Sequence, residues 1–356
     1  MKWREMFLRF KLLLILFLLA LLIVPVIPAA GGRDLSLPDA LELGAEASFE
    51  IKKAKLSWEN ARLNYEKNKA TNLLSSSRYS ELQLELNLLK AEENYQRTRD
   101  QALLGIARGY LELSKTEQER AWRRKQVEWE EMSLNTLQKQ VEQGYETRAA
   151  LMRQENEYHS QRLTLKTVDN NYAQLLRELA MEIGWTAVPS TLELKPVNTT
   201  LNWNLSEEEC LNLAQQNSLT LRVCALEVEL AQVAKTRAEI DAVLAVERQE
   251  LDNDLQLALL RQQEASWELE NSVREQYTAL TQLAENLALN QDHLATARAN
   301  FQKVQQQQEV GLLKNIDRLA AEAELLQAEY QMLTAVTNYQ LKKWEFQQLL
   351  GLDLEV

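Results

Sequence analysis

Long runs without glycine or proline constrain this chain more than any other feature. The run Leu219–Val310 holds neither residue, and Gly311 and Gly351 enclose a second such run. After Gly32 only seven glycines and three prolines remain, well below the usual frequencies of about 7% and 5%. A helix is the common structure that accepts such runs. We therefore expect an almost entirely helical protein.

Apolar residues in the second of these runs follow the spacing of a coiled coil. Two series of them alternate steps of three and four residues. They are Ile316, Leu319, Ala323, Leu326, Tyr330 and Leu333, and Leu325, Ala328, Met332, Ala335 and Tyr339. Because each residue advances about 100° around a helix, the two series face different neighbours. We therefore expect this helix to lie in a bundle or wall of helices.

The same stretch occurs twice in the chain. A shift of 167 residues places Gly311 on Gly144 and Gly351 on Gly184, and one apolar series shifts with them. The early parts of the two halves match at a shift of 170, so three residues are missing from the second half, near the position of Ser75–Ser77. Self-similarity of this kind indicates an internal duplication.

The duplication predicts how the chain is organised. A first helical-hairpin repeat should span residues 35–185, and a second should span residues 204–351. Residues 186–203 hold the last two prolines of the chain and form the one plausible non-helical linker. Residues 352–356 are a short tail.

Each half is predicted to open with a capped helix. The segments Ser36–Asp39 and Ser206–Glu209 both have the spacing of a capping box. The first half should continue as helix over Ala47–Leu74 and then reverse at the serines that follow. The apolar side of this helix is formed by Phe49, Ile51, Leu56, Ala61 and Tyr65.

A very long helix should follow over about Arg78–Gln143. At 1.5 Å per residue it would be about 100 Å long, a length that suits a tunnel or a spacer better than a globular domain. Gly105 and Gly109 lie inside it, and we interpret them as positions of close helix approach. Gly144 then supplies a turn, and Thr147 caps the returning helix.

The first 30 residues have the features of a secretory leader. Four basic residues precede the wholly apolar segment Leu12–Val24, and the small residues Ala29 and Ala30 follow it. This order is typical of a signal peptide. An uncleaved N-terminal anchor is the alternative, since a membrane span needs about 20 apolar residues. Either one predicts an exported chain in the cell envelope.

The remaining chain should be strongly acidic. Loss of the leader, with four basic residues and one acidic residue, moves the formal net charge from −12 to −15. This argues against a nucleic-acid partner. His159 and His293 are the only histidines, and neither has a metal-ligand spacing. Because phosphate-binding loops, nucleophile motifs and metal-ligand sets are also missing, we predict no enzyme and no catalytic, metal or cofactor site.

The two cysteines allow two interpretations. Cys210 and Cys224 could form a disulfide, because an exported chain reaches an oxidising environment. Alternatively both are small core residues, and Cys210 takes the place that Ala40 has in the first half. We favour the second interpretation, because Ala40 shows that the position needs only a small side chain.

The second hairpin carries a family resemblance. Val310-Gly311-Leu312, with Asp317 six residues after the glycine, precedes an alanine-rich coiled-coil helix that ends at Leu349-Leu350-Gly351. This order resembles the second tip hairpin of TolC-type outer-membrane efflux factors. The segments Leu35–Leu37 and Leu205–Ser206 look like the opening helices of that family. The resemblance covers nearly all of the chain after the leader.

The resemblance implies an all-α fold and an assembly. The fold would be two tandem repeats of long antiparallel coiled-coil hairpins, as in the TolC α-barrel, and the linker would belong to an equatorial belt. Three copies of the chain would close a tunnel. Members of the family carry cargo in efflux or secretion, and their hairpin tips dock a periplasmic adaptor protein of a tripartite pump.

The chain departs from that family at its two reversals. Family members insert two membrane strands at each, and each strand needs about 9 to 11 residues. Leu74–Leu82 is too short for one strand, and Val243–Leu255 is interrupted by five charged residues. No transmembrane β-barrel is therefore predicted. In the second half only Asp252–Asp254 hints at a turn, and the reversal is inferred from symmetry.

The hairpin tips are the candidate binding site. The two tip turns should lie side by side at one end of the molecule. The predicted docking residues are Gly144, Tyr145, Thr147, Arg148, Val310, Gly311, Leu312, Leu313 and Asp317. The glycines could serve turn geometry alone, but exposed apolar side chains beside Gly311 favour a partner surface.

Two functions fit these observations. The first is a TolC-like efflux or secretion conduit component that docks an adaptor. The second is an exported coiled-coil spacer or scaffold without transport activity.

Overall fold

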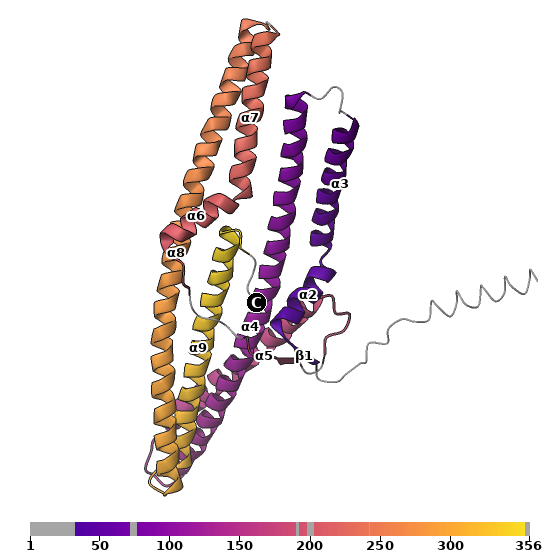
Figure 1. The fold of residues 1–356 in the computed structure, drawn as a ribbon. Coiled ribbons are helices and arrows are strands. Elements are labelled where there is room, and N and C mark those ends of the chain that lie inside the picture. The colour runs from indigo at the N-terminus through magenta and orange to yellow at the C-terminus, as the bar shows by residue number, and fades with distance from the viewer. Residues whose placement is uncertain (1–32, 72–76, 190–191, 198–202, 242, 353–356) are drawn as a thin grey trace, which may run out of the picture.

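A computed structural model describes residues 33–71, 77–189, 192–197, 203–241 and 243–352. The N-terminal leader predicted from the sequence lies outside these residues. The elements in chain order are β1 (Arg33–Leu35), α2 (Leu37–Ala47), α3 (Phe49–Thr71), α4 (Arg78–Glu142), α5 (Arg148–Glu182), β2 (Leu192–Leu194), α6 (Glu207–Asn217), α7 (Leu219–Ile240), α8 (Ala245–Glu309) and α9 (Asn315–Leu349). Figure 1 shows a long rod of antiparallel helices.

The helices confirm the two tandem repeats. Helices α2, α3, α4 and α5 contain 11, 23, 65 and 35 residues, and α6, α7, α8 and α9 contain 11, 22, 65 and 35. The structure also shows where the second repeat is three residues shorter than the first. Helix α7 is one residue shorter than α3, and the turn at 241–244 is two residues shorter than the connection at 72–77.

Each repeat begins as its sequence predicted. Ser36 caps α2 in a capping box with Asp39, and Ser206 caps α6 in a capping box with Glu209. A difference follows at Ser48, which ends α2 with extended backbone before α3 begins at Phe49. The predicted helix over Ala47–Leu74 therefore starts after a bend and ends at Thr71.

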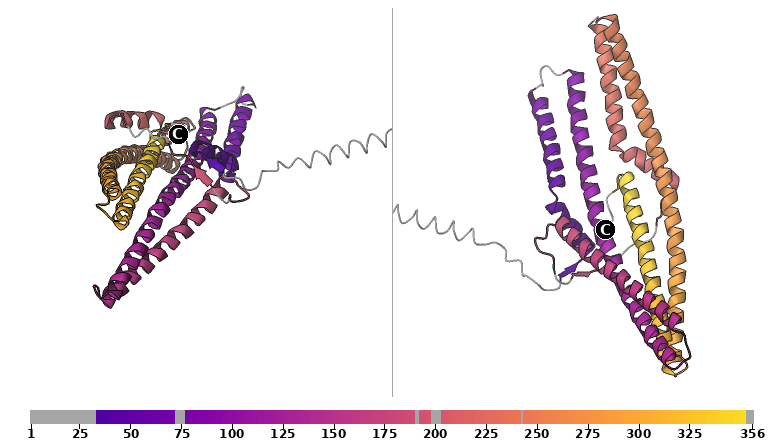
Figure 2. Two further views of the ribbon diagram at one scale, coloured as in Figure 1. Left: turned by 90° about the horizontal axis from the view of Figure 1, so that it is seen from below. Right: turned by 180° about the vertical axis from the view of Figure 1, so that it is seen from behind.

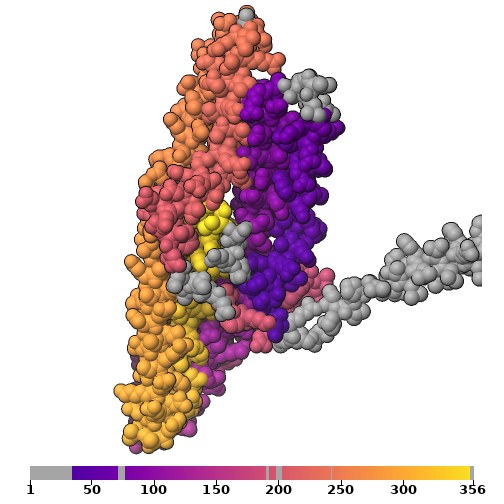
Figure 3. Space-filling model, in the orientation of Figure 1, coloured from indigo at the N-terminus to yellow at the C-terminus, as the bar shows by residue number. Residues whose placement is uncertain are grey.

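The long helices form a wall four helices wide. Near the tip turns the contacts run in the order α5, α4, α9, α8, and beyond the middle of the rod they run α3, α4, α7, α8. Helices α4 and α8 run through both parts, and the shorter helices fill the positions between and beside them (Figures 1 and 2). The space-filling view shows α8 along one side of the molecule and α3 on the other (Figure 3).

The second reversal lies earlier than its turn signal suggested. Helix α7 ends at Ile240 and α8 begins at Ala245, so Asp252–Asp254 lies inside α8. Lys235 on α7 forms an ion pair with Asp252, at 2.6 Å between Nζ and Oδ1. Asp252 therefore serves helix pairing, and this is why its acidic character was a misleading turn signal. Symmetry between the halves predicted a reversal without giving its position, and the structure places it between Ile240 and Ala245.

Two short strands were not predicted. Strands β1 and β2 pair in parallel with Leu35 opposite Leu194, and β2 lies in the predicted non-helical linker. Tyr110 of α4 is completely buried behind them. Its hydroxyl lies 2.8 Å from the carbonyl oxygen of Leu35 and 2.7 Å from that of Lys195. The phenol therefore ties the strand pair to the long helix, and its burial raises the pKa of Tyr110 to about 12.

Tyr110→Phe should lower the free energy of unfolding by about 1 kcal/mol, the usual net value of one hydrogen bond. The ring stays packed, so the loss reports only the link between α4 and the strands. Chemical denaturation followed by circular dichroism measures it. Tyr277→Phe is the matched control, because Tyr277 occupies the equivalent place in the second repeat and its contact is with the ring of Phe346. Equal losses in both variants would contradict this role of Tyr110.

The core is also duplicated. One buried cluster lies where α2, α4 and α5 meet the strands, and another lies where α6, α8 and α9 meet. Equivalent positions are Ala40 and Cys210, Tyr110 and Tyr277, Leu113 and Leu280, Leu179 and Phe346, and Ile183 and Leu350. Trp344 of α9 is buried in the first cluster, so it joins the two repeats.

One of the two cysteines is a core residue. Cys210 and Cys224 are both free thiols, and Cys210 is completely buried in the second cluster. Burial raises the pKa of both thiols. The favoured interpretation from the sequence therefore holds for Cys210, whereas Cys224 is only partly buried, and neither thiol is in a disulfide.

Not all of the predicted apolar side of α3 faces the core. Ile51 is buried, but Phe49 and Leu56 are 77% and 59% exposed. The expectation for these two residues was wrong for the single chain, because α3 lies at one edge of the wall and packs mainly against α4.

Within the described part of the chain, no helix combines the length and the apolar character that crossing a membrane would require.

Candidate partner-binding site at the hairpin tips

The two tip turns share one backbone geometry. Gly144 and Gly311 both have a φ of 80°, which favours glycine. After Gly144 the amide of Tyr145 donates to the carbonyl of Gln140 at 2.8 Å. After Gly311 the amide of Leu312 donates to the carbonyl of Gln307 at 2.9 Å. These bonds close the last turns of α4 and α8 in the Schellman arrangement.

The returning helices are capped by different side chains. Thr147 Oγ1 accepts from the amide of Ala150 at 3.1 Å, as predicted. Asp317 Oδ2 accepts from the amide of Lys314 at 2.9 Å. Asp317 therefore stabilises the second turn itself, and through it the position of the side chains beside Gly311.

The tips present apolar side chains to solvent. Val310 and Leu312 are 71% and 73% exposed on the second tip, and Tyr145 is 78% exposed on the first. Leu313 is half-buried behind them, and Arg148 is exposed at the start of α5. The second tip therefore presents a small exposed apolar surface, and burial of one leucine side chain contributes about 1.5–3 kcal/mol.

The tip turns lie at the same end of the molecule but not side by side. Figure 1 shows both hairpins ending at the bottom of the rod, and the view from below in Figure 2 separates them. Asn315, at the start of α9, contacts α4 at Met132, with 3.7 Å between Nδ2 and Sδ. Met132 lies about three helical turns before Gly144. The α4–α5 hairpin thus continues past the second tip, and the expectation of adjacent tips was wrong.

Polar and aromatic contacts hold α9 against α4 above the tips. The rings of Trp122 and Tyr330 stack with centroids 5.5 Å apart. The Nζ of Lys125 lies 3.4 Å from Oε1 of Glu322. Gln118 adds a hydrogen bond of 3.1 Å to Glu329. This contact fixes the second hairpin to the first, so the distance between the two tips is set by the wall.

A buried carboxylate lies between the helices of the first hairpin. Glu130 of α4 is only 4% exposed, and it accepts a hydrogen bond of 2.6 Å from Nε2 of Gln154. Burial raises the pKa of Glu130, the bond from Gln154 lowers it, and the nearby Glu157 raises it. The net effect is a pKa above the usual value.

Glu130→Gln should stabilise the protein at neutral pH and have little effect in acid. Because the pKa is raised in the folded state, folding favours the protonated carboxyl, and wild-type stability falls as the pH rises above about 4.5. Glutamine removes this loss. Thermal unfolding between about pH 4 and pH 8 measures the growing difference. Exposed Glu142→Gln is the control, and a difference that does not change with pH would contradict this account.

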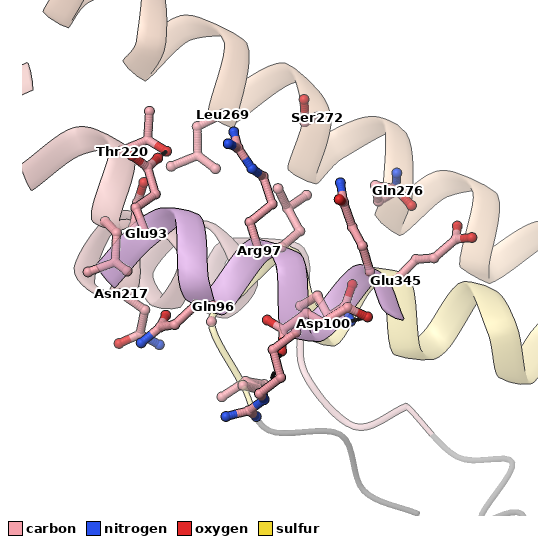
Figure 4. Close-up of a pocket in the computed structure, with 18 residues that line it drawn as sticks. Glu93, Gln96, Arg97, Asp100, Asn217, Thr220, Leu269, Ser272, Gln276 and Glu345 are labelled. Atoms are coloured by element: carbon pink, nitrogen blue, oxygen red, sulfur yellow. Dashed lines mark hydrogen bonds and ion pairs between the residues drawn. The ribbon is translucent and has the colours of Figure 1, made fainter. Parts of the chain in front are cut away.

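Two hollows lie at equivalent places near the middle of the rod, and they were not found from the sequence. The first-repeat hollow, about 620 Å³, is lined by Gly44, Ala47, Phe49, Gly105, Met181, Glu182 and Gly184 among others. The second-repeat hollow, about 570 Å³, is lined by the corresponding parts of α7, α8 and α9 and also by residues 93–101 of α4 (Figure 4). Each forms where segments distant in the sequence meet, and local sequence patterns do not reveal such a place.

The glycines of α4 differ in their surroundings. A Cβ at Gly109 would lie 3.7 Å from Leu179, so this residue allows α5 to approach, as predicted. A Cβ at Gly105 would meet no described atom within 4 Å. Within the described chain Gly105 therefore serves no close approach.

Among the described residues, no group of three or more histidine, cysteine, aspartate or glutamate side chains is placed to hold a metal ion.

No protein-family profile matches this sequence, and no curated protein matches it. Solved structures do resemble the fold. The outer-membrane channel OprN aligns with a TM-score of 0.66 and 12% identity, over 90% of this chain and 91% of OprN. CusC, a protein that forms a transmembrane channel, aligns with a TM-score of 0.62 and 14% identity, over 92% of this chain and 96% of CusC. VceC, an outer membrane protein of Vibrio cholerae, aligns with a TM-score of 0.59 and 14% identity, over 90% and 97%.

Proposed function

Because the chain has the α-helical fold of TolC-type outer-membrane efflux channels, we propose that it forms the wall of an efflux or secretion conduit in the cell envelope. The observation that carries this proposal is the wall of long helices with two unpaired edges, α8 on one side and α3 with α5 on the other. One chain supplies only part of a cylinder. A closed ring of copies, three by likeness to the channels, would enclose a tunnel.

The tips are the proposed docking site for a periplasmic adaptor protein. Val310 and Leu312 supply an exposed apolar surface, and the capped turns hold it rigidly. The first tip, with Tyr145 and Arg148, is more polar and lies apart from the second. An adaptor hairpin would therefore meet a polar and an apolar tip at different positions around the ring.

The proposal is tested by assembly and capture together. The purified chain is mixed with a periplasmic adaptor protein of a tripartite pump, and the mass of the complex is measured. The conduit predicts a closed oligomer that retains the adaptor. A chain that assembles but retains no adaptor would instead support an exported spacer or scaffold without transport, and a chain that stays monomeric at high concentration would contradict the conduit.

A further inference from the structure

The two hollows differ in one wall. In the second-repeat hollow, residues 93–101 of α4 cross the start of α7 and the end of α9 (Figure 4). Two hydrogen bonds mark this contact. Thr220 of α7 donates to Glu93 at 2.5 Å, and Gln348 of α9 donates to the carbonyl oxygen of Asp100 at 2.8 Å. The described lining of the first-repeat hollow comes only from α2, α3, α4, α5 and the turns beside them.

The internal repeat identifies the missing wall. The long helices match at a shift of 167 residues, so residues 93–101 of α4 correspond to residues 260–268 of α8. In the same chain α8 lies at the opposite edge of the wall from α3 and α5. The segment that would complete the first-repeat hollow must therefore come from another copy of this chain.

Exposed apolar side chains lie at the matching positions. Trp267 takes the place of Asp100, and Met181 takes the place of Gln348; these two residues are 67% and 71% exposed. Leu289 takes the place of Trp122, and Leu163 takes the place of Tyr330; these are 53% and 66% exposed. The corresponding residues of the other repeat are in direct contact within one chain. Gln348 contacts Asp100, and Tyr330 contacts Trp122.

Other exposed residues extend the two surfaces. The α8 edge also carries Leu257 and Leu260, which are 50% and 58% exposed. The opposite edge carries Phe49 and Leu56, at the places of Leu219 and Leu226. Leu219 and Leu226 pack against α4 inside the chain. Apolar side chains thus lie on both edges at several of the positions where the internal contact predicts an intermolecular one.

We propose that Trp267 of one copy inserts into the first-repeat hollow of the next, so that the α8 edge packs on the α3 and α5 edge. This inference rests on the proposed ring of copies and assigns its contact. The hollow, at about 620 Å³, is large enough for an indole ring. Gly105 leaves its floor open. Glu182 lines the hollow, and its carboxylate is a group that can accept a hydrogen bond from an indole N–H.

Cysteine cross-linking tests the contact directly. The background is Cys210→Ala with Cys224→Ser, because Ala40 shows that alanine suits the buried position. Trp267→Cys and Met181→Cys are made in separate chains, co-expressed and oxidised. Covalent dimers should form in the mixture and in neither variant alone, and a chain with both substitutions should form a ladder of covalent oligomers. Cross-linking of Trp267→Cys with itself, or oligomers without any cross-link in the mixture, would overturn the proposal.

Two substitutions test the contact, one on each of its two surfaces, and neither should disturb the fold of the isolated chain. Trp267→Glu removes the inserted ring, and Gly105→Phe fills the hollow, and both positions are open in the single chain. Each should weaken assembly at least tenfold in a dilution series, with unchanged circular dichroism. Leu244→Glu is the control, since Leu244 is 77% exposed at the turn between α7 and α8. Assembly of Trp267→Glu equal to that of the control would overturn the inference.

Failure of this contact and failure of the proposed function are distinguishable. Rings that capture the adaptor without the Trp267 cross-link would leave the conduit standing and reject the contact. Cross-linked rings that capture no adaptor would keep the contact and reject the docking.

Discussion

Phe346→Ala should lower the free energy of unfolding by about 3–5 kcal/mol, the range for removing a buried aromatic ring. Phe346 is completely buried in the second core cluster. Its ring lies 5.0 Å from that of Trp203 and 6.5 Å from that of Tyr277, centroid to centroid. Alanine would leave a cavity where α6, α8 and α9 meet, so chemical denaturation of the dissociated chain should show the loss.

Phe49→Ala is the matched control for this change. It removes the same atoms from a side chain that is 77% exposed in the single chain. The expected change is within about 0.5 kcal/mol, as for most surface substitutions. Equal losses in the two variants would mean that Phe346 is not part of a packed core.

Leu312→Asp should abolish adaptor capture, with a loss of at least about 100-fold in affinity. Burial of the leucine would contribute about 1.5–3 kcal/mol, and each 1.4 kcal/mol is a factor of ten. Desolvation of the new carboxylate adds to the loss. The turn itself should survive, because the bond from Leu312 to Gln307 uses the backbone amide.

Capture of the variant is measured on immobilised adaptor at several protein concentrations. Leu244→Asp is the control, because this leucine is equally exposed at the far end of the rod. Unchanged circular dichroism in both variants shows that folding is intact. Capture of Leu312→Asp at the wild-type level would remove the second tip from the docking site.

The helices could be predicted because their signals are local. Glycine and proline scarcity predicts long helices, and Ser36 and Ser206 mark the starts of the first helix in each repeat. The similarity of the two halves also predicted that the second half reverses, although it did not give the position of the turn. Asp252–Asp254 misled because acidic residues serve turns and helix surfaces equally well.

Contacts between distant segments could not be predicted in the same way. Strands β1 and β2 have three residues each, too few for a periodic pattern, and the hydroxyl of Tyr110 joins them to α4. Periodicity identified Phe49 as apolar, but it does not distinguish a core within the chain from a contact with another copy. A residue-by-residue comparison of the two halves would have indicated the contact between copies, because Trp267 stands where the first half has Asp100.

The distance between the tips is likewise a tertiary property. Each turn was predicted from its glycine, and both have the expected left-handed geometry. Their separation depends on where α9 packs along α4, which the stacked rings of Trp122 and Tyr330 determine. Neither residue is near a tip in the sequence.

Electron cryo-microscopy of the purified chain tests the conduit most directly. The account predicts a closed ring of identical copies around an open channel, with Trp267 of each copy in the hollow beside Gly105 of the next and all tip turns at one end. A solitary rod, or a solid bundle without a channel, would contradict it.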